Sequence, residues 1–567
     1  MKKLYILTIL GLAGGLYAHG QGAIDAYSLS QPDMKGTARF MSMGGAFGAL
    51  GGDLSSISQN PAGIGVYRSN DVGFTLDLDI QNSNSQADGM KYNLNQTKFL
   101  LNNIGAVFTL RLPSKTFPNV NFGFTYNKAA SFNRIVGGNI MNLQNSMSNY
   151  IAGIANANEL TEGDVVSTPD YDPYNPGYND YAAPWLAILG YDSYLITPEL
   201  DPKTGMTNWY GQWADSRSGN PTIGSGNFYM NEKGSVNEFN IAFGGNISDV
   251  LYWGMNFDII NLNYSLSSIW GENLENALVP DASSTLVRNT AEWSLHNAYS
   301  VSGTGFNYQL GFILKPVQEF RLGFAFHTPT WYSLNENFGA SVNYLYGGSE
   351  KGFATTNDGL LGYNQFGLRT PWKIIASAAG VIGSNFILSF DYEWANYGTM
   401  HLSEPSYYSG YDYGYDWWPY SGGPVASNFI DPNDPYAYEN ADIANYYKSS
   451  NTFRVGLEFK PTNRFSIRAG YAHVSSPVKK EAKNNLETIY TAGTNPSYRF
   501  DNNTNYVTCG LGYRLNQFYA DLAYVYKHMG SEYHAYTPDI ENRNIPSPQS
   551  KLNYVNNQVV LTLGYRF

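Results

Sequence analysis

Apolar and polar side chains alternate strictly through Val72-Gly73-Phe74-Thr75-Leu76-Asp77-Leu78-Asp79-Ile80. This period of two is typical of a β-strand with one apolar and one polar face. A strand of about nine residues is long enough to cross a bilayer at a tilt. The same alternation returns at about 104–112, 120–126, 239–243, 253–259, 301–315, 319–329, 372–381, 386–394, 453–459, 465–471, 507–513, 518–526 and 559–567.

These fourteen strands predict an all-β fold, a transmembrane antiparallel β-barrel, because only a closed sheet satisfies every backbone group inside lipid. Short and long connections alternate, the longest being about 130–235 and 399–451. Short turns are typical of the periplasmic side and long loops of the outside, so we expect both chain ends in the periplasm. A soluble β-sandwich or propeller also alternates, but it does not explain this rhythm together with an export signal, and no fixed-period repeat suggests a propeller.

The N-terminus is typical of a signal peptide over residues 1–20. Lys2 and Lys3 precede a nearly uninterrupted apolar run to Tyr17, and Ala18-His19-Gly20 supplies small residues for cleavage. No cysteine follows, so a lipoprotein cleavage site is absent. After residue 20 no apolar run approaches the eighteen residues of a transmembrane helix. We therefore expect an exported chain that inserts into the outer membrane as an integral barrel.

The composition agrees with a barrel. Charged residues make up 14%, against the roughly 25% usual in soluble domains, while aromatic residues reach 16% and the mean hydropathy is −0.33. The net charge of −12 opposes nucleic-acid binding, which needs a basic surface. The single cysteine, Cys509, cannot form an internal disulfide and fits a small apolar strand residue.

A glycine-rich segment precedes the first strand. It contains Met43-Gly44-Gly45-Ala46-Phe47-Gly48 and, after Asp53, Asn60-Pro61-Ala62-Gly63. The glycines allow tight turns and close approach of backbones. Asp53 is suited to cap a short helix over residues 54–59, which Asn60-Pro61 then ends. Such a small element must pack against something larger.

On these residues the chain resembles the FadL/TodX family of outer-membrane transport proteins for hydrophobic compounds. Further matches are Gly303-Thr304-Gly305, Gly311, Pro316, Arg321-Leu322-Gly323, Pro329 and Thr370-Pro371. The resemblance implies an N-terminal lead and hatch over 21–70, which plugs the periplasmic mouth of a barrel over 71–567. The implied hatch residues are Gly44, Gly45, Asp53, Asn60, Pro61 and Ala62.

The resemblance also implies a route for the ligand. Outer loops would capture a hydrophobic compound, an apolar pocket in the lumen would receive it, and an opening beside an inwardly kinked strand would release it into the membrane. The lead over 21–37 departs from the family pattern, and we expect the N-terminus itself not to fill this pocket.

The alternation predicts which charged side chains face the lumen: Arg111, Arg321, His327, Asp391, Glu393, Arg454, Glu458, Arg464 and Arg468. An arginine held there would receive a carboxylate head group, and the candidates are Arg321, Arg454 and Arg468. The alternative is a ladder of ion pairs, Glu458 with Arg464 or Arg468, that only braces the wall.

The outer loops carry aromatic and acidic clusters. The tyrosine-rich stretch 407–420 would form a landing site for ligand, a sugar-binding surface or a self-packed cap, and short helices are expected at 152–160 and 182–189. Two acidic groups, Asp431 with Asp434, Glu439 and Asp442, and Asp170 with Asp172 and Asp180, do not match a calcium-binding loop. We expect no metal, no cofactor and no enzymatic activity, since no catalytic constellation is present.

Two functions remain. The first is passive uptake of long-chain fatty acids or other hydrophobic compounds through a hatch-plugged barrel with lateral release. The second is a barrel that transports nothing and acts as a scaffold or shuttle for protein secretion. A general porin is disfavoured because a hatch would block an aqueous channel. The expected partners are a hydrophobic small molecule, outer-membrane lipid and the barrel-assembly machinery, which would recognise the terminal Phe567. We expect a monomer.

Overall fold

The computed structural model describes residues 22–176, 183–214, 220–281, 285–383, 385–404, 434–483, 489, 491, 493–537 and 547–567. The predicted signal peptide, the tyrosine-rich stretch 407–420, Asp180 and Asp431 lie outside the described residues.

The main sheet contains β1 Asp71–Ala87, β2 Met90–Arg111, β3 Asn119–Ser131, β4 Arg134–Ile140, β7 Ile223–Ile247, β8 Leu251–Pro280, β9 Leu286–Val317, β10 Phe320–His327, β11 Trp331–Tyr346, β12 Glu350–Thr355, β13 Gly362–Arg369, β14 Lys373–Ile382, β15 Phe386–Asn396, β16 His401–Ser403, β17 Ser449–Phe459, β18 Phe465–Val474, β19 Tyr498–Leu515, β20 Phe518–His534 and β21 Gln549–Arg566. A separate hairpin pairs β5 Ile196–Leu200 with β6 Thr207–Gly211. The helices are α1 Ala23–Ser30, α2 Ala38–Ser42, α3 Met147–Ala157, α4 Trp185–Asp192, α5 Ala437–Tyr446 and α6 Lys480–Lys483, with 3₁₀ turns η1 Leu54–Ser56, η2 Pro61–Val66, η3 Glu162–Asp164, η5 Thr356–Gly359 and η6 Tyr397–Thr399.

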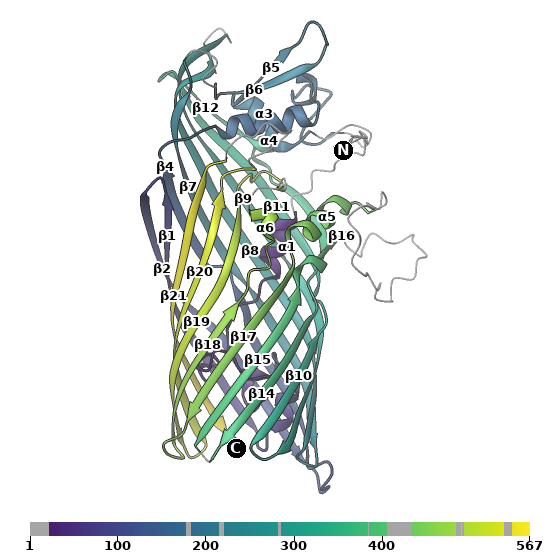
Figure 1. Ribbon diagram of the computed structural model, residues 1–567. Coiled ribbons are helices and arrows are strands. Elements are labelled where there is room, and N and C mark those ends of the chain that lie inside the picture. Colours follow the sequence, from purple (N-terminus) through teal and green to yellow (C-terminus); the bar gives the residue numbers. More distant parts are fainter. Residues whose placement is uncertain are drawn as a thin grey trace, which may run out of the picture.

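The sheet closes on itself, which confirms the predicted fold. β1 pairs antiparallel with β21 from Asp71↔Arg566 to Gln86↔Lys551, so the first and last strands form the seam (Figure 1). The nineteen segments make fourteen strands because β3–β4, β10–β11, β12–β13–β14 and β15–β16 are interrupted single strands. Predicted turns at Ser248-Asp249 and Asn516 lie at the short-turn end with positive φ.

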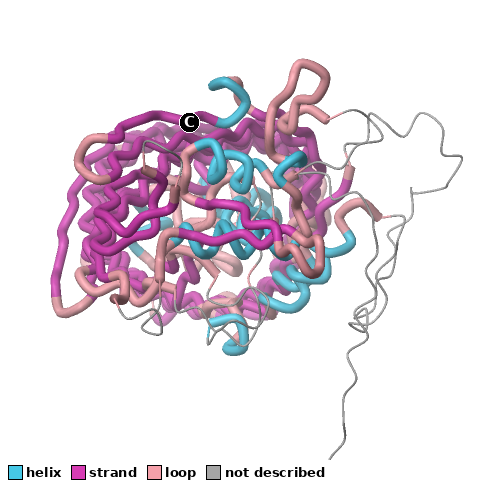
Figure 2. Tube along the Cα trace, turned by 90° about the horizontal axis from the view of Figure 1, so that it is seen from above, coloured by secondary structure: helices cyan, strands magenta, loops and turns pink. Residues whose placement is uncertain are grey.

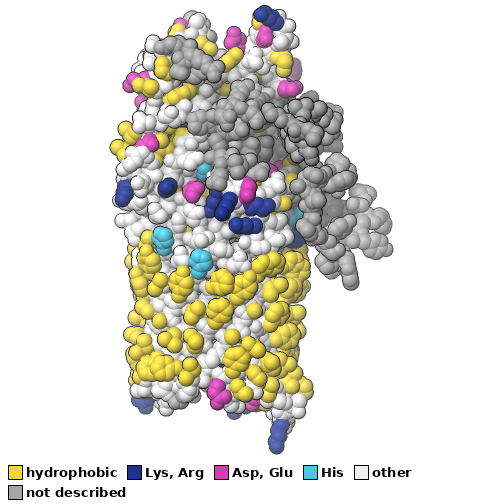
Figure 3. All heavy atoms as spheres, in the orientation of Figure 1, with side chains coloured by type: hydrophobic (Ala, Val, Ile, Leu, Met, Phe, Trp, Pro, Cys, Tyr) yellow, Lys and Arg dark blue, Asp and Glu magenta, His cyan; other side chains and the backbone are white. Residues whose placement is uncertain are grey.

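An apolar belt surrounds the half of the barrel that carries the short turns (Figure 3). Its side chains point outward and are exposed, among them Phe124, Ile259, Leu322, Leu457 and Leu561. Their strand neighbours point inward and are buried. In the described residues no helix has the length and apolar character needed to cross a membrane. The residues of the belt named above lie on β3, β8, β10, β17 and β21, as the alternation predicted.

The strands are longer than the sequence indicated. The first strand was expected to end near Ile80 and the second to begin near Ile104. Instead β1 and β2 stay paired up to Ala87↔Met90, on either side of the tight turn Asp88-Gly89. β8 and β9 likewise stay paired to Pro280↔Leu286. The extension of β1 is polar on both faces, so alternation could not reveal it. The extensions of β8 and β9 alternate with their apolar side chains turned inward, where Leu262, Trp270 and Leu295 are buried. Much of the expected outer loop is therefore sheet that projects beyond the belt.

The described part of the chain begins with α1 near the loop end of the barrel (Figure 1), not on the periplasmic side as expected. Seen from above, helices lie inside the ring of strands (Figure 2). Tyr27 of α1 stacks on Tyr447 with ring centroids 4.7 Å apart. The chain then descends through residues 31–37 to the short-turn end, where residues 38–66, the hatch segment, lie inside the barrel. The last residue of the chain, Phe567, exchanges backbone hydrogen bonds of 3.1 and 3.0 Å with Asn70, just before β1.

The long loop after β4 folds into a cap over the outer mouth. α3 and α4 pack together with the β5–β6 hairpin, and Trp209 donates its indole N–H to the Leu160 carbonyl at 2.7 Å. Both helices agree with the two short helices expected in this loop, within a few residues. Ile151, Ala187 and Ile188 are fully buried in the core of this cap.

Candidate functional site: the lumen and a break in the wall

The hatch segment is held by side chains that cap its own turns. Asp53 accepts hydrogen bonds from the Ser55 N–H at 3.0 Å and the Thr37 hydroxyl at 2.7 Å, and so begins η1. Asn60 accepts from the Ala62 N–H at 3.1 Å and begins η2 with Pro61 at its first position. The predicted helix over 54–59 is thus a single 3₁₀ turn followed by a second one. Asp53 and Asn60 act here as N-caps, which explains why the segment needs these residue types.

Glycines let the hatch segment lie directly against the wall. Gly44 has φ +62°, and a Cβ there would lie 2.9 Å from the backbone nitrogen and oxygen of Tyr471. On the wall, a Cβ at Gly254 would collide with the Pro61 carbonyl, and one at Gly323 with the Gly48 carbonyl. A Cβ at Gly311 would collide with the Asn60 side-chain oxygen and lie 2.9 Å from the Ala62 backbone nitrogen. The glycines noted in the sequence at 311 and 323 therefore mark positions where the two backbones meet.

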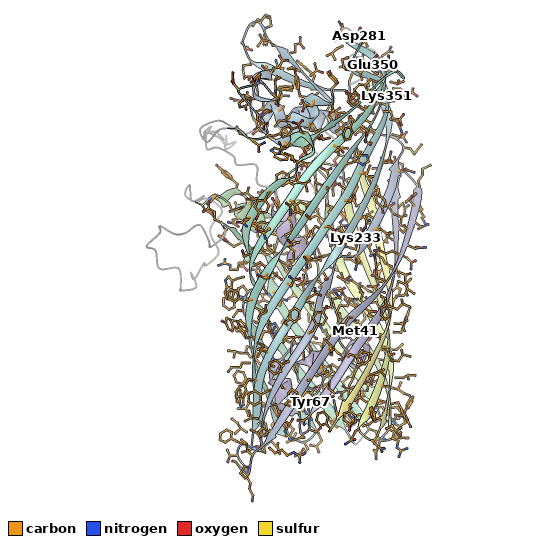
Figure 4. The ribbon with its side chains drawn as sticks, turned by 180° about the vertical axis from the view of Figure 1, so that it is seen from behind. Met41, Tyr67, Lys233, Asp281, Glu350 and Lys351 are labelled. Carbon is orange, nitrogen blue, oxygen red and sulfur yellow. The ribbon has the colours of Figure 1, made fainter. Side chains whose placement is uncertain are left out.

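Polar groups complete the contact between hatch segment and wall. Asp391 on β15 accepts from the Gly48 N–H at 3.0 Å and from the Gln59 amide at 2.8 Å. His327 on β10 lies 3.0 Å from the Gln59 carbonyl. Gly45 and Ala62 are enclosed, with Ala62 fully buried. The six predicted hatch residues therefore lie in one segment inside the short-turn end of the barrel, where Met41 and Tyr67 (Figure 4) are also buried.

The lead is ion-paired to the inner wall. Lys35 has a fully buried side chain whose Nζ lies 2.7 Å from Asp77 and 3.3 Å from Asp79 on β1. Asp33 pairs with Lys527 on β20 at 2.9 Å. These residues were not among the predicted site residues. The acidic residues in the inward half of β1 were a usable signal, because two neighbouring buried carboxylates need a cation nearby.

A cavity of about 280 Å³ lies in the lumen between α1 and the hatch segment. The lead lines it from Tyr27 to Lys35, and the expectation that the N-terminus itself does not fill the pocket stays a prediction. Its other walls mix apolar side chains, such as Val236 and Ile260, with charged ones, which include Lys128, Glu238, Lys373, Glu393 and Arg454. The pocket is therefore not the purely apolar one that the resemblance implied, and it suits a ligand that carries both an apolar part and a charged or hydrogen-bonding group.

Only one of the three predicted head-group arginines reaches this cavity. Arg454 donates to Glu393 at 2.7 Å through Nη2, while its buried Nη1 has no hydrogen-bond partner in the described residues. Arg321 donates to the Leu50 carbonyl of the hatch segment at 2.8 Å. Arg468 pairs with Glu458 at 2.8 Å and Asp521 at 2.5 Å. Neither Arg321 nor Arg468 lines the cavity.

The ion-pair ladder considered from the sequence exists in part. Glu458 contacts Arg468, and it also lies 3.1 Å from Arg39 of the hatch segment. Two of the predicted lumen residues lie at the mouth of the barrel: Arg111 ends β2 and Arg464 immediately precedes β18, and both are exposed at the short-turn end. Arg111 donates there to the Arg68 carbonyl at 2.8 Å. His327, Asp391, Glu393, Arg454 and Glu458 do face inward, as predicted.

The wall is broken between β2 and β3. These strands pair only from Arg111↔Asn119 up to Asn103↔Asn127. Beyond that point β2 remains paired with β1 alone, and β3 continues past a bulge at Lys128–Ala130 into β4, which pairs with β7 alone. A bulge at Asn102 also turns that side chain into the lumen, where it donates to Asp77 at 3.1 Å.

The inner side of this break is covered by the lead and by β4. The Ala129 carbonyl accepts from the Asp33 N–H at 2.9 Å. The Ile135 N–H donates to the Gln81 side chain at 3.3 Å, which places β4 on the lumen side of the β1–β2 hairpin. On the outer side, Phe99 is 69% exposed at the edge of the belt. The break thus joins a lumen wall to a lipid-facing surface.

The described residues contain no group of three or more His, Cys, Asp or Glu side chains arranged to hold a metal ion. The described members of the two acidic loop groups, Asp170 and Asp172 in one and Asp434, Glu439 and Asp442 in the other, do not form such a site.

Comparisons with known proteins found similarity only at the level of structure. No family model matches the sequence, and no curated protein matches it. Among solved structures, a Pseudomonas aeruginosa FadL homologue is 12% identical with a TM-score of 0.49, and 94% of this chain aligns with 99% of that one. The P. putida toluene transporter TodX gives 12% identity, a TM-score of 0.48 and coverage of 94% and 99%. The Ralstonia pickettii toluene transporter TbuX is 11% identical with a TM-score of 0.45, and 95% of this chain aligns with 100% of that one. Similarities this distant say nothing about ligand or activity.

Proposed function

We propose that the protein is an outer-membrane channel for passive uptake of amphiphilic or hydrophobic small molecules, with lateral release through the break between β2 and β3. The observation that carries this proposal is the position of the cavity. Its lining includes Asn127, Lys128, Ala129 and Ala130, the residues at which β3 leaves β2. A ligand in the cavity would therefore lie directly behind the break, while the hatch segment separates it from the periplasmic mouth.

The charged lining favours an amphiphile over a plain hydrocarbon. Lys128 donates to the Asn237 side chain at 3.2 Å, and neither it nor Lys373 has a carboxylate within ion-pair distance in the described residues. With the unpartnered Nη1 of Arg454, these groups offer donors to an anionic head group, since a charge-assisted hydrogen bond to a buried carboxylate is strong. A long-chain fatty acid has this chemistry.

The second candidate is the secretion scaffold. It is favoured by the lumen, in which α1, the lead and the hatch segment occupy most of the space, and by the folded cap of α3, α4 and the β5–β6 hairpin over the outer mouth. A channel that uses the lumen for transport must move or bypass these elements, whereas a scaffold has no such need.

Ligand binding by the purified, folded barrel tests the head-group assignment. We expect saturable binding of a long-chain fatty acid and weaker binding of the corresponding alcohol. The double variant Arg454→Gln/Glu393→Gln removes the pair without leaving one charge buried, and we expect it to lower fatty-acid affinity about tenfold, the loss of one charge-assisted hydrogen bond, with alcohol binding unchanged. Absence of fatty-acid binding by a demonstrably folded wild-type barrel would favour the scaffold.

Uptake in cells tests the lateral route. Ala129→Trp places a large ring at the break on the cavity side, and we expect it to reduce uptake strongly while binding persists. Ala376→Trp is the matched control, because Ala376 is exposed on the lipid-facing side of β14. Equal uptake by both variants would show that the ligand does not leave between β2 and β3.

A further inference from the structure

Four lysines gather on the outside of the barrel where β17 begins and β18 ends. Lys448 precedes β17, and Lys479, Lys480 and Lys483 follow β18 on and beside α6. Lys448 and Lys480 are exposed, and Lys479 and Lys483 are partly exposed. We call these four residues the lysine patch. The space-filling view shows blue side chains gathered just beyond the apolar belt on this face (Figure 3).

Backbone hydrogen bonds hold the four positions together. The Lys448 N–H donates to the Pro477 carbonyl and the Lys479 N–H to the Tyr446 carbonyl, both at 2.8 Å. The Lys483 N–H donates to the Lys479 carbonyl at 3.2 Å, which closes one helical turn. Residues three and four apart on a turn are side-chain neighbours, so Lys479 and Lys480 both lie beside Lys483. The patch is therefore built by the fold and is not a chance scatter of loop residues.

This concentration of positive charge has little internal compensation. None of the four lysines forms an ion pair in the described part of the chain; the Lys479 ammonium donates to the Ala444 carbonyl at 2.6 Å, and that of Lys483 donates to the Asn502 side chain. Glu481 shares the turn, and Glu532 on β20 is near enough to act on Lys483. Burial lowers the pKa of Lys483; Glu532 and Asp501 oppose this shift, and repulsion from Lys448 adds to it. Like charges at this spacing destabilise a turn, and the chain as a whole is acidic, with a net charge of −12.

The patch lies a short distance beyond the outer edge of the belt. Toward the loop end, the last outward apolar side chains are Phe453 on β17, Tyr471 on β18 and Tyr526 on β20, which are 43%, 45% and 36% exposed. Lys448 is five residues beyond Phe453, roughly 16 Å along the strand at about 3.3 Å per residue and less in height because strands tilt. If the belt spans the hydrocarbon core, the lysines lie at the level of lipid head groups in the outer leaflet.

We propose that the lysine patch is a binding site for a phosphate-bearing lipid of the outer leaflet, with the acyl chains against the belt on β17, β18 and β20 and the phosphates against Lys448, Lys479, Lys480 and Lys483. The exposed rings of Phe453 and Tyr471 supply the apolar contact next to the charges. The ammonium groups are point charges that bind phosphate without a fixed geometry, which fits a flexible lipid head group. None of the four lysines lines the lumen cavity, and the site does not depend on the uptake proposed above.

Native mass spectrometry of the purified barrel tests the site with a bisphosphorylated, acylated disaccharide lipid as the probe. Each lysine near an anionic lipid head group contributes roughly fivefold to affinity, so Lys480→Gln/Lys483→Gln is expected to weaken binding roughly 25-fold. The matched control is Lys115→Gln/Lys315→Gln, which removes the same charge from one exposed and one partly exposed position at the short-turn end. Circular dichroism and heat-dependent gel mobility verify that both variants fold.

The proposal is supported if the patch variant alone loses affinity, if the dephosphorylated lipid binds more weakly to the wild type, and if salt weakens binding. It is overturned if the patch variant binds as the control does, or if phosphorylated and dephosphorylated lipids bind equally. Competition by inorganic phosphate alone, at the same concentration as the lipid, would also overturn it, because the site would then recognise a free anion and not a lipid.

Discussion

At the scale of the residue, Lys35 is the centre of the ion pairing inside the barrel. Its buried ammonium compensates Asp77 and Asp79 and also donates to Gln558 at 3.2 Å. Lys35→Met leaves buried carboxylates without a cation, so we expect a loss of about 3–5 kcal/mol in the free energy of unfolding, measured by urea denaturation in detergent. Lys35→Met/Asp77→Asn is expected to recover part of this loss. Lys91→Met, at an exposed position, is the control, and equal stability of the Lys35 and Lys91 variants would contradict the assignment.

At the scale of the element, the docking of α1 is expected to depend on pH through Asp25. Burial raises the pKa of Asp25 from 3.8 to about 7, although the Gly22 N–H hydrogen bond opposes this shift. The docked helix therefore holds a proton that the undocked helix releases, so docking is strongest below pH 4 and weakens as the pH rises to 7. Hydrogen exchange over residues 23–30, corrected for intrinsic rates, should be several-fold faster at pH 8 than at pH 5. Asp25→Asn should abolish this difference, and persistence of the difference in that variant would assign it to another group.

At the scale of the whole molecule, the hatch segment is expected to seal a barrel whose wall closes without it. The seam between β1 and β21 and the other strand pairings do not include residues 38–66. Deletion of residues 22–66 should therefore leave a folded barrel and raise single-channel ion conductance in planar bilayers well above that of the full chain. The folded state is verified by heat-dependent gel mobility. A folded deletion variant that does not conduct would show that the outer cap alone closes the lumen.

Much of the fold could be predicted because alternation is a local property of the chain. Each strand across the belt must present apolar residues to lipid and polar residues to the lumen, so Val72 to Ile80 and its counterparts identify themselves one at a time. The extension of β1 toward Ala87 is polar on both faces and lacks this signature. The extension of β8 toward Pro280 alternates in the opposite sense, with apolar side chains such as Leu262 and Trp270 buried on the inside. The turn at Asp88-Gly89 was a readable signal, since this dipeptide favours a tight hairpin.

The candidate site was predictable only in part. Asp53 and Asn60 act on backbone groups two residues away, so their roles as caps follow from local spacing. Arg454 and Arg468 both face inward by the same alternation, yet one lines the cavity and the other is enclosed by Glu458 and Asp521. Which of them is available to a ligand depends on strands distant in the chain.

The sequence by itself determined the number of strands, the faces that meet lipid and lumen, and the capped turns of the hatch segment, because these depend on neighbours within a few residues. Only the tertiary structure decided the downward path of the lead, the pairing of Lys35 with Asp77 and Gln558, and the break between β2 and β3. These features join residues up to 523 positions apart. Contacts of that range arise when the barrel closes around the N-terminal segment, and no local pattern specifies them.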